Sequence, residues 1–372
     1  MRGLKFVTAR DYDGGCGCNT LNNTRIFFMR EEKTQISELG EFGLIDRLTA
    51  GFTPRNASTV KGYGDDAAVI DAGECYMLIT TDMMLEGVDF DLVYFPLKHL
   101  GYKLVVRGIN DILAMNGRPQ QIMVSVGVSS KFCVEDLEEL YGGIRQACED
   151  YGLDLAGGDT TASVNGLALS IQAIGSVAKD KIVYRSGARE NDIVCITGDL
   201  GAAYMGLHLL EREKRIYAGN DSPQPQFEGH EYILRRQLKP YAPIEVIDAL
   251  AAEGIVPTSM IDLSDGLASD ILQICKSSGC GVRLYLERIP IARETHRMAE
   301  ELHADPVVAA LNGGDDNELM FTVPVTEQAR IAKIGGIDII GHITSASAGT
   351  HLITPDGTAL SITAPGFKTA TE

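Results

Sequence analysis

Apolar and polar residues follow two periods along this chain, and the periods predict both helices and strands. Apolar positions three and four residues apart predict helices over residues 36–48, 97–115, 134–151, 202–212, 231–238, 243–253, 266–278 and 291–311. Short apolar runs predict strands over residues 67–70, 77–81, 121–128, 153–156, 167–178, 192–197, 259–263, 281–286, 337–344 and 350–354. Strands and helices in both halves of the chain predict a mixed α/β (α+β) class.

The same pattern divides the chain into three parts. Residues 1–35 are rich in Asn, Gly and Arg and have neither period, so we expect a disordered N-terminal extension. We expect an N-terminal domain over residues 36–180 and a C-terminal α/β domain over residues 181–372, with the boundary between 178 and 192. A chain of 372 residues is long enough for two domains that each bury a core of their own.

The charge balance excludes one class of partner and suggests another. Asp and Glu number 51 against 33 Lys and Arg, which gives a formal charge of −18. A nucleic-acid-binding protein needs the opposite sign, so we expect no nucleic-acid partner. An acidic protein can still bind phosphorylated ligands when divalent cations lie between the two sets of negative charges.

Cysteine usage and the absence of long apolar runs suggest a compartment. The eight cysteines are scattered, and several lie in apolar runs, which is typical of a reducing environment. No run of about 18 apolar residues is present, so we expect a cytoplasmic protein without a membrane partner. Cys16 and Cys18 could hold a metal ion, but no second pair of ligands matches them.

Aspartates beside Gly, Ser, Thr or Asn recur six times at positions where we expect loops. The motifs are Gly64-Asp65-Asp66, Thr80-Thr81-Asp82, Asn110-Asp111, Gly157-Gly158-Asp159-Thr160-Thr161, Asp262-Leu263-Ser264-Asp265-Gly266 and Gly313-Gly314-Asp315-Asp316. Any one of them can be an ordinary turn or a helix N-cap. Mg²⁺ prefers carboxylate oxygens together with substrate phosphates, and glycine lets a phosphate approach the backbone. Recurrence in both halves therefore favours a magnesium and phosphate site.

Other nucleotide signatures are absent or weak. The chain has no G-x-x-x-x-G-K-[ST] sequence, and the match at Gly62-Tyr-Gly64 follows no predicted strand. Gly198-Asp-Leu-Gly201 does lie between a predicted strand and a helix. It leaves a dinucleotide-dependent oxidoreductase open as an alternative, although the same turn can be purely structural. The sequence shows no Ser/His/Asp or Cys/His set typical of nucleophilic catalysis. Phosphoryl transfer does not require one, because it needs positioning and charge neutralisation more than it needs a general base.

The motifs in this order resemble the thiamine-monophosphate kinase family, within the aminoimidazole-ribonucleotide-synthetase superfamily, from about residue 36 to residue 367. Besides the aspartate motifs, the resemblance rests on Gly40-Glu-Phe-Gly-Leu-Ile45 and Arg185-Ser-Gly-Ala188. It implies a two-domain fold whose N-terminal sheet pairs across a homodimer into a barrel, with ATP along the cleft between the halves. It also implies ATP- and Mg²⁺-dependent phosphorylation of thiamine monophosphate to thiamine diphosphate by direct in-line transfer.

The resemblance assigns roles to individual positions. The implied metal ligands are Asp65, Asp66, Thr80, Thr81, Asp82, Asp111, Asp159, Asp262 and Asp265, and the candidates for catalysis among them are Asp66, Asp82, Asp111 and Asp159. The implied ATP contacts are Tyr141, Gly158, Asp159, Arg185 and Ser264. The implied acceptor positions are Asp89, Asp315 and Phe367.

The chain departs from the family pattern mainly on the acceptor side. The family usually has His at position 89, Glu at 315, Tyr at 317 and Trp or Tyr near 367, where this chain has Asp, Asp, Asn and Phe. The usual Val-Asn before the third motif reads Arg107-Gly108. A carboxylate at position 89 would face the acceptor phosphate with like charge. Two alternatives therefore stay open: a divergent paralogue that phosphorylates another small phosphorylated or carboxylated metabolite, and a nucleotide-binding relative without turnover.

Overall fold

The computed structural model of the chain describes residues 34–218 and 225–364. The expectations for the extension up to residue 33, for the pair Cys16 and Cys18, and for Phe367 therefore lie outside the described residues. The described residues divide into two compact units, a small one up to Ala50 and a larger one from Gly51 onward. Helix α1 (Ile36–Thr49) belongs to the first unit and confirms the helix predicted there, with an interruption at Gly40, where φ is 65°.

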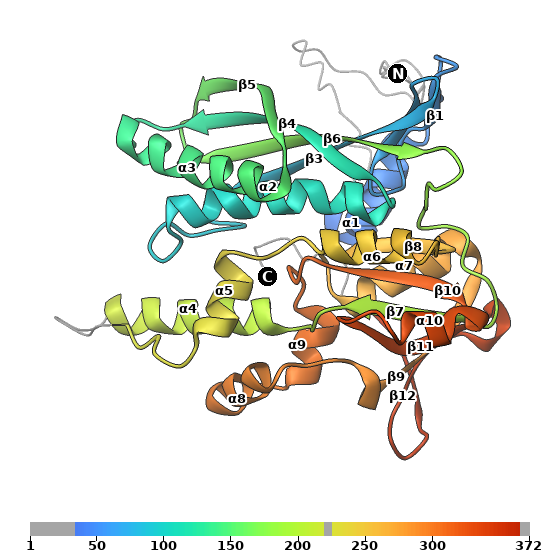
Figure 1. Cartoon of the computed structure of the whole chain (residues 1–372). Coiled ribbons are helices and arrows are strands. Elements are labelled where there is room, and N and C mark those ends of the chain that lie inside the picture. Colours follow the sequence, from blue (N-terminus) through green and yellow to red (C-terminus); the bar gives the residue numbers. More distant parts are fainter. Residues whose placement is uncertain (1–33, 219–224, 365–372) are drawn as a thin grey trace, which may run out of the picture. The chain divides into compact units, whose positions relative to one another are not determined.

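The first sheet has six strands and occupies the N-terminal half of the larger unit (Figure 1). Its order is β1 (Thr59–Lys61), β2 (Ala68–Asp71), β3 (Cys75–Leu85), β6 (Ala168–Ala178), β4 (Arg118–Val128) and β5 (Asp154–Ala162). Neighbouring strands are antiparallel except β4 and β5, which are parallel. β3 and β5 are longer than predicted, so Asp82 and Asp159 lie on strands and not in loops.

Helices α2 (Leu97–Ala114) and α3 (Val134–Tyr151) cover one face of this sheet (Figure 1). Buried and half-buried residues alternate along β6, as expected for a strand with one covered face. Gly101 and Gly143 bring the two helices close together. A Cβ atom at Gly101 would lie 2.1 Å from the Leu140 carbonyl oxygen, and one at Gly143 would lie 1.8 Å from the Lys98 carbonyl oxygen. Both positions therefore require glycine.

The second sheet has seven strands, and its neighbours are antiparallel except for the parallel pair of β12 and β9. Its order is β13 (Ala359–Ser361), β12 (Thr350–Ile353), β9 (Cys280–Tyr285), β11 (Ile337–Ser345), β7 (Asp192–Thr197), β10 (Glu318–Pro324) and β8 (Ser259–Leu263). The two sheets with their helices confirm the predicted mixed α/β class.

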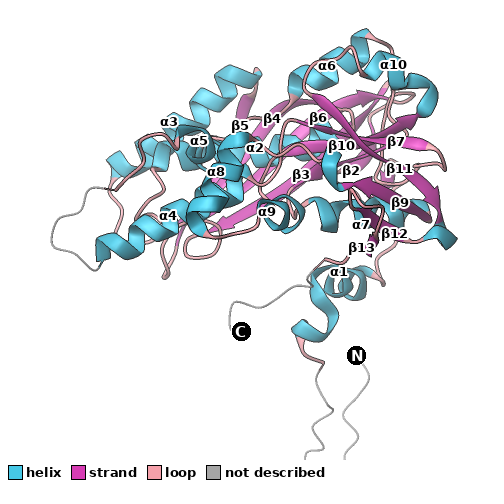
Figure 2. Cartoon of the chain, turned by 90° about the horizontal axis from the view of Figure 1, so that it is seen from below, coloured by secondary structure: helices cyan, strands magenta, loops and turns pink. Residues whose placement is uncertain are grey.

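Among the described residues, seven helices accompany the second sheet: α4 (Ala202–Ala218), α5 (Glu231–Leu238), α6 (Ile244–Ala252), α7 (Leu267–Ser278), α8 (Arg293–Leu302), α9 (Pro306–Asn312) and α10 (Gln328–Ile331). Three short 3₁₀ helices lie at Leu286–Arg288, Val325–Glu327 and Ala346–Ala348. Helices α4, α5, α8 and α9 gather on one side of the strands (Figure 2). The single helical stretch predicted over 291–311 is two helices. His303 ends α8 with a φ of 53°, and Pro306 begins α9 behind an Asp305 cap.

Helix α2 is the central element of the larger unit. It packs against β3, β4 and β6 of the first sheet and against β8, β10 and α5 of the second half. Most of its residues are buried, which is typical of a helix enclosed by a core on more than one side. Charged residues on α2 are therefore held between the two halves. Among the described residues, no helix is long and apolar enough to cross a membrane.

Candidate metal and phosphate site

Three aspartates from distant parts of the chain meet beside α2. Asp66 lies in the loop before β2, Asp111 lies on α2, and Asp262 lies on β8. One carboxylate oxygen from each residue lies within 4.8 Å of the other two. Asp66 and Asp262 are each only 7% exposed. The fold therefore brings together three of the predicted metal ligands from both halves of the chain, and we call them the aspartate triad.

The electrostatics of the aspartate triad fit a divalent cation. Burial raises the pKa of Asp66 to about 6 and that of Asp262 to about 8. Burial, followed by the nearby charges of Asp82, Asp262 and Asp66, raises the pKa of Asp111 well above its usual range. Asp66 Oδ2 is buried and has no hydrogen-bond partner among the described residues. Buried carboxylates with like charge and an unsatisfied oxygen need positive charge, and oxygen donors of this kind suit Mg²⁺.

Arg185 and Thr80 orient two members of the triad. Arg185 donates from Nε (3.1 Å) and Nη2 (2.7 Å) to Asp66 Oδ1. The backbone N–H of Arg185 donates to Asp65 Oδ1 at 3.0 Å, so Asp65 positions the arginine while Asp66 receives its side chain. The Thr80 hydroxyl donates to Asp111 Oδ2. Asp65 and Thr80 thus lie around the triad and act through their neighbours.

A second group of charges follows the same face of α2. Lys103, Arg107 and Asp111 are spaced by four residues, so their side chains lie one above the other. Lys103 is fully buried, donates to the Gln237 carbonyl oxygen at 2.8 Å and forms an ion pair with Asp315. The predicted acceptor residue Asp315 is therefore matched by a cation.

Arg107 faces two carboxylates. Its Nη2 lies 3.9 Å from Asp82 Oδ1, and its Nη1 lies 3.5 Å from Asp89 Oδ1. The other oxygen of Asp89 accepts a hydrogen bond of 2.8 Å from the Leu85 N–H. The like-charge repulsion expected from a carboxylate at position 89 is therefore offset by a neighbouring guanidinium, which local sequence could not reveal.

Two aspartate motifs of the second half are joined by backbone hydrogen bonds. Asp315 N–H donates to the Ser264 carbonyl oxygen at 2.8 Å, and Asn317 N–H donates to the Leu263 carbonyl oxygen at 3.1 Å. Asp315 has a φ of 62°, and the Asn317 side chain donates to its carbonyl oxygen at 2.7 Å. This places Asp315 next to the turn that carries Ser264 and Asp265, both of which are exposed.

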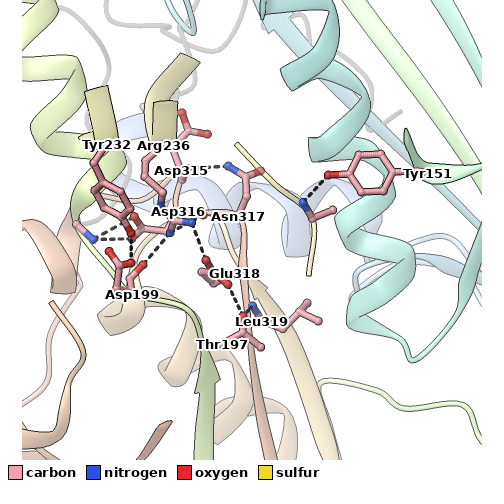
Figure 3. Close-up of polar contacts among 12 residues, drawn as sticks. Tyr151, Thr197, Asp199, Tyr232, Arg236, Asp315, Asp316, Asn317, Glu318 and Leu319 are labelled. Atoms are coloured by element: carbon pink, nitrogen blue, oxygen red, sulfur yellow. Dashed lines mark hydrogen bonds and ion pairs between the residues drawn. The ribbon is translucent and has the colours of Figure 1, made fainter. Parts of the chain in front are cut away.

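A separate acidic network lies behind Asp315 (Figure 3). Arg236 Nη1 lies 2.7 Å from Glu318 Oε1, and Arg236 Nη2 donates to the carbonyl oxygens of Asp199 (2.7 Å) and Asp316 (3.2 Å). Both oxygens of Asp316 accept from the Gly201 N–H at 3.0 Å, and burial raises the pKa of Asp316 to about 7. The Tyr232 hydroxyl donates to Asp199 Oδ2 and the Thr197 hydroxyl donates to Glu318 Oε2, while Asp199 Oδ1 and Arg236 Nε have no hydrogen-bond partner among the described residues. We call this set the Arg236 network.

The Arg236 network bears on whether the turn at Gly198–Gly201 could bind a dinucleotide. The carboxylate of Asp316 occupies the N-terminus of α4, where a dinucleotide would place its pyrophosphate. β7, which precedes this turn, is also antiparallel to both of its neighbours, whereas a dinucleotide-binding unit needs parallel strands. The turn is therefore structural.

Asp159, Gly158 and Thr81 do not join the aspartate triad within one chain. Strand register places Asp82 and Gly158 on one line across the sheet, with β6 and β4 between their strands, a separation of about 14 Å. Thr81 and Asp159 belong to the alternate positions and face the opposite side of the sheet from Asp82. Tyr141 on α3 lines a hollow of about 540 Å³ beside the first residues of β5.

Comparison with known proteins identifies the family. The chain matches AIR synthase related protein, N-terminal domain, over residues 64–177 and the corresponding C-terminal domain over residues 189–353. Thiamine-monophosphate kinase of Aquifex aeolicus is 30% identical over 326 residues, which cover 85% of this chain and 99% of that protein. This chain belongs to the thiamine-monophosphate kinase family.

Other members of the thiamine-monophosphate kinase family agree. The enzyme of Escherichia coli is 31% identical over 311 residues, covering 82% of this chain and 87% of its own. The solved structure of AaThiL complexed with AMPPCP and TMP matches with a TM-score of 0.74 at 27% identity, over 89% of this chain and 97% of that one. The predicted family and the predicted two-domain fold are confirmed.

Three charged residues near the candidate site of this family member escape prediction from sequence. Lys103 lies in no aspartate motif, and Arg107 is visible only as a departure from the family pattern. Asp270 on α7 is 2% exposed, and its Oδ2 has no hydrogen-bond partner among the described residues. Burial, with the charges of Asp265 and Asp262, raises the pKa of Asp270 well above its usual range. The sequence signal for these three residues is a charge within the apolar pattern of a helix. Such a charge faces solvent just as often, so the signal alone does not identify a buried residue.

Proposed function

We propose that this protein transfers the γ-phosphoryl group of ATP to thiamine monophosphate and forms thiamine diphosphate. The observation that carries the proposal is the meeting of Asp66, Asp111 and Asp262 in one buried triad. Support for the substrates comes from relatives that are thiamine-monophosphate kinases and from the related structure that binds AMPPCP and TMP. The cysteine usage favours the cytoplasm as the place of action.

The residues of the site supply charge placement and not a general base. Asp66, Asp111 and Asp262, with Asp82 beside them, would hold Mg²⁺, which neutralises the phosphates and the charge that develops between them. Arg185 and Asp65 fix the Asp66 carboxylate through the hydrogen bonds described above. An acceptor that is itself a phosphate is mostly ionised near pH 7, so its attacking oxygen needs no proton removed.

A homodimer would account for Thr81 and Asp159, which do not join the aspartate triad within one chain. The uncovered face of the first sheet exposes Met77, Met83 and Leu85, with exposed fractions of 36%, 58% and 39%. Thr81 and Asp159 lie on that same face. Pairing of two such faces would bury the apolar residues and would let the partner subunit's Asp159 complete a site. We expect ATP to lie along the edge strand β5 of this sheet, near Gly158 and Tyr141.

The decisive experiment incubates the protein with ATP and Mg²⁺ and a panel of small acceptors, and quantifies ADP and the phosphorylated product. We expect thiamine diphosphate from thiamine monophosphate, with no product from thiamine. Turnover of a different phosphorylated acceptor would replace the substrate and favour a divergent paralogue, an alternative motivated by Asp89 and Asp315. Nucleotide binding without ADP formation on any acceptor would reject the kinase assignment.

A further inference from the structure

Arg107 stands out among the arginines of the site because its hydrogen-bonding capacity is largely unused. Arg185 makes two hydrogen bonds of 2.7 and 3.1 Å to Asp66, and Arg236 makes three of 2.7 to 3.2 Å in its network. Within the described residues, Arg107 makes one side-chain hydrogen bond, 3.5 Å long, to Asp89. A guanidinium has five N–H donors in a planar fork, so most of those of Arg107 are available to a further ligand.

Arg107 lies at a position from which it can reach a phosphate at the aspartate triad. It is one helical turn from Asp111 on the same face of α2, and its Nη2 faces Asp82. About a quarter of its side chain is exposed, as are those of Asp82 (23%) and Asp89 (27%). An anion can therefore approach the guanidinium without rearrangement of the core.

The surrounding charges hold Arg107 protonated while using few of its donors. Burial opposes the charge, but the carboxylates of Asp315, Asp82, Asp89 and Asp262 outweigh it and raise the pKa of Arg107 above its ordinary value. Asp89 is itself fixed by the Leu85 N–H, and Asp315 by the fully buried Lys103. The carboxylates of Asp315 and Asp89 are thus each paired with a cation, Lys103 and Arg107. Of the two cations, Arg107 is the one whose N–H donors remain available to a ligand.

We propose that Arg107 binds the phosphate of the acceptor and that Asp89 tethers its guanidinium in place. In-line phosphoryl transfer requires two phosphates on opposite sides of the transferred group. Arg185, on one side of the triad, already donates two short hydrogen bonds to Asp66, whereas Arg107, on the side of Asp82, makes only one long hydrogen bond among the described residues and is open to a ligand. A planar fork that binds a phosphate through two parallel hydrogen bonds gives both affinity and selection for phosphorylated acceptors. This inference rests on the proposed function.

The test compares Arg107→Met and Arg107→Lys with wild-type protein in steady-state assays of ADP release. We expect Arg107→Met to raise KM for thiamine monophosphate about tenfold or more while KM for ATP changes less than about threefold. Arg107→Lys keeps the charge but loses the fork, so its KM should lie between the two. Arg330→Met is the matched control, because Arg330 also faces two carboxylates (Glu327 and Glu253) but on a surface of the C-terminal half.

A second comparison separates phosphate binding from simple neutralisation of Asp89. If Arg107 only cancels the charge of Asp89, the double variant Arg107→Met with Asp89→Asn recovers the wild-type KM, and the proposal is overturned. If Arg107 binds the phosphate, the double variant stays at the raised KM. Calorimetry in the presence of AMPPCP adds a readout that needs no turnover: wild-type protein should bind thiamine monophosphate more tightly than thiamine, and Arg107→Met should lose most of that preference.

The outcomes distinguish this inference from the function on which it rests. If the wild-type protein phosphorylates thiamine monophosphate and Arg107→Met does so with the same KM, the proposed role of Arg107 is overturned and the kinase assignment stands. A raised KM for ATP alone would move Arg107 to the nucleotide side and also overturn the proposal. Wild-type protein that neither binds nor phosphorylates thiamine monophosphate overturns the proposed function first, and the inference with it.

Discussion

Two acidic clusters lie within the larger unit, and they differ in how their carboxylates are satisfied. In the Arg236 network, both oxygens of Asp316 accept from the Gly201 N–H, and both oxygens of Glu318 are bonded, one to Arg236 and one to the Thr197 hydroxyl. In the aspartate triad, Asp66 keeps a buried oxygen without a partner among the described residues. A buried carboxylate oxygen without a partner occurs in both clusters, since Asp199 Oδ1 of the Arg236 network also has none among the described residues. What distinguishes the aspartate triad is that three carboxylates lie within 4.8 Å of one another, an arrangement that suits a cation.

The contrast has a thermodynamic meaning. The carboxylates of the Arg236 network surround a cation that the chain itself supplies, so removal of that cation should damage the fold. The aspartate triad is incomplete within the chain, so removal of one of its charges should damage function and relieve repulsion. The following predictions test this division, beginning with the largest expected effect.

Asp66→Asn and Asp111→Asn should each lower kcat/KM by about 1000-fold or more, because each removes a charge that would hold a phosphate-bridging Mg²⁺. Without Mg²⁺, the melting temperature of Asp111→Asn should equal or exceed that of the wild type, since one of several repelling carboxylates is gone, whereas Asp66→Asn also loses its ion pair with Arg185 and should not be stabilised. Kinetics at saturating ATP and Mg²⁺, with circular dichroism melts, measure both. Activity within tenfold of the wild type would remove these residues from the metal site.

Arg236→Met should lower the free energy of unfolding by about 3–5 kcal/mol, because it leaves the buried carboxylates of Glu318 and Asp316 without their cation. Arg330→Met removes an exposed arginine with two acidic neighbours and should cost less than about 1 kcal/mol. Urea unfolding of the three proteins provides the values. Equal stability of Arg236→Met and the wild type would show that the network is not structural.

Local sequence predicted most of the fold because the apolar period is strong where elements are buried on one side. It misread β5, since Gly157-Gly158-Asp159 is typical of a turn and glycine and aspartate are depleted in strands. This edge strand is instead held by its pairing with β4, a contact between distant segments. The expected single helix over 291–311 was wrong because the break between His303 and Pro306 depends on backbone conformation at one residue.

The candidate site was predictable in its acids and not in its bases. Aspartate beside glycine or threonine is a local signal, and it pointed to Asp66, Asp111 and Asp262 before any geometry was known. Lys103 and Arg107 give no such signal, because a charged residue on a helix is usually exposed. Their burial follows from the packing of α2 between two sheets that are far apart in sequence. Counter-charges of this kind become visible only in three dimensions.

The division between residues that act within one chain and residues that act across a dimer gives the next prediction. Asp111→Asn and Asp159→Asn should each be inactive alone, but subunit exchange between them should restore about a quarter of wild-type activity. Half of the dimers would then be hybrids, each with one intact site. Asp111→Asn exchanged with Asp66→Asn is the control and should recover nothing, since both residues belong to one chain's triad. No recovery in the first mixture would place Asp159 in the same chain's site.

The smallest expected effect concerns Mg²⁺ and the stability of the aspartate triad. A ligand present at about 100 times its Kd stabilises the folded state by about 2.7 kcal/mol. For a chain of this size that corresponds to a rise in melting temperature on the order of 2–5 °C. We expect this rise when Mg²⁺ is added without nucleotide, with KCl at equal ionic strength as the reference.

Binding relieves repulsion among buried carboxylates, so the rise should disappear in Asp111→Asn. It should persist in Glu318→Gln, whose overall stability is lower, because the Arg236 network needs no metal. A Mg²⁺ response lost in Glu318→Gln but kept in Asp111→Asn would reverse the roles assigned to the two clusters.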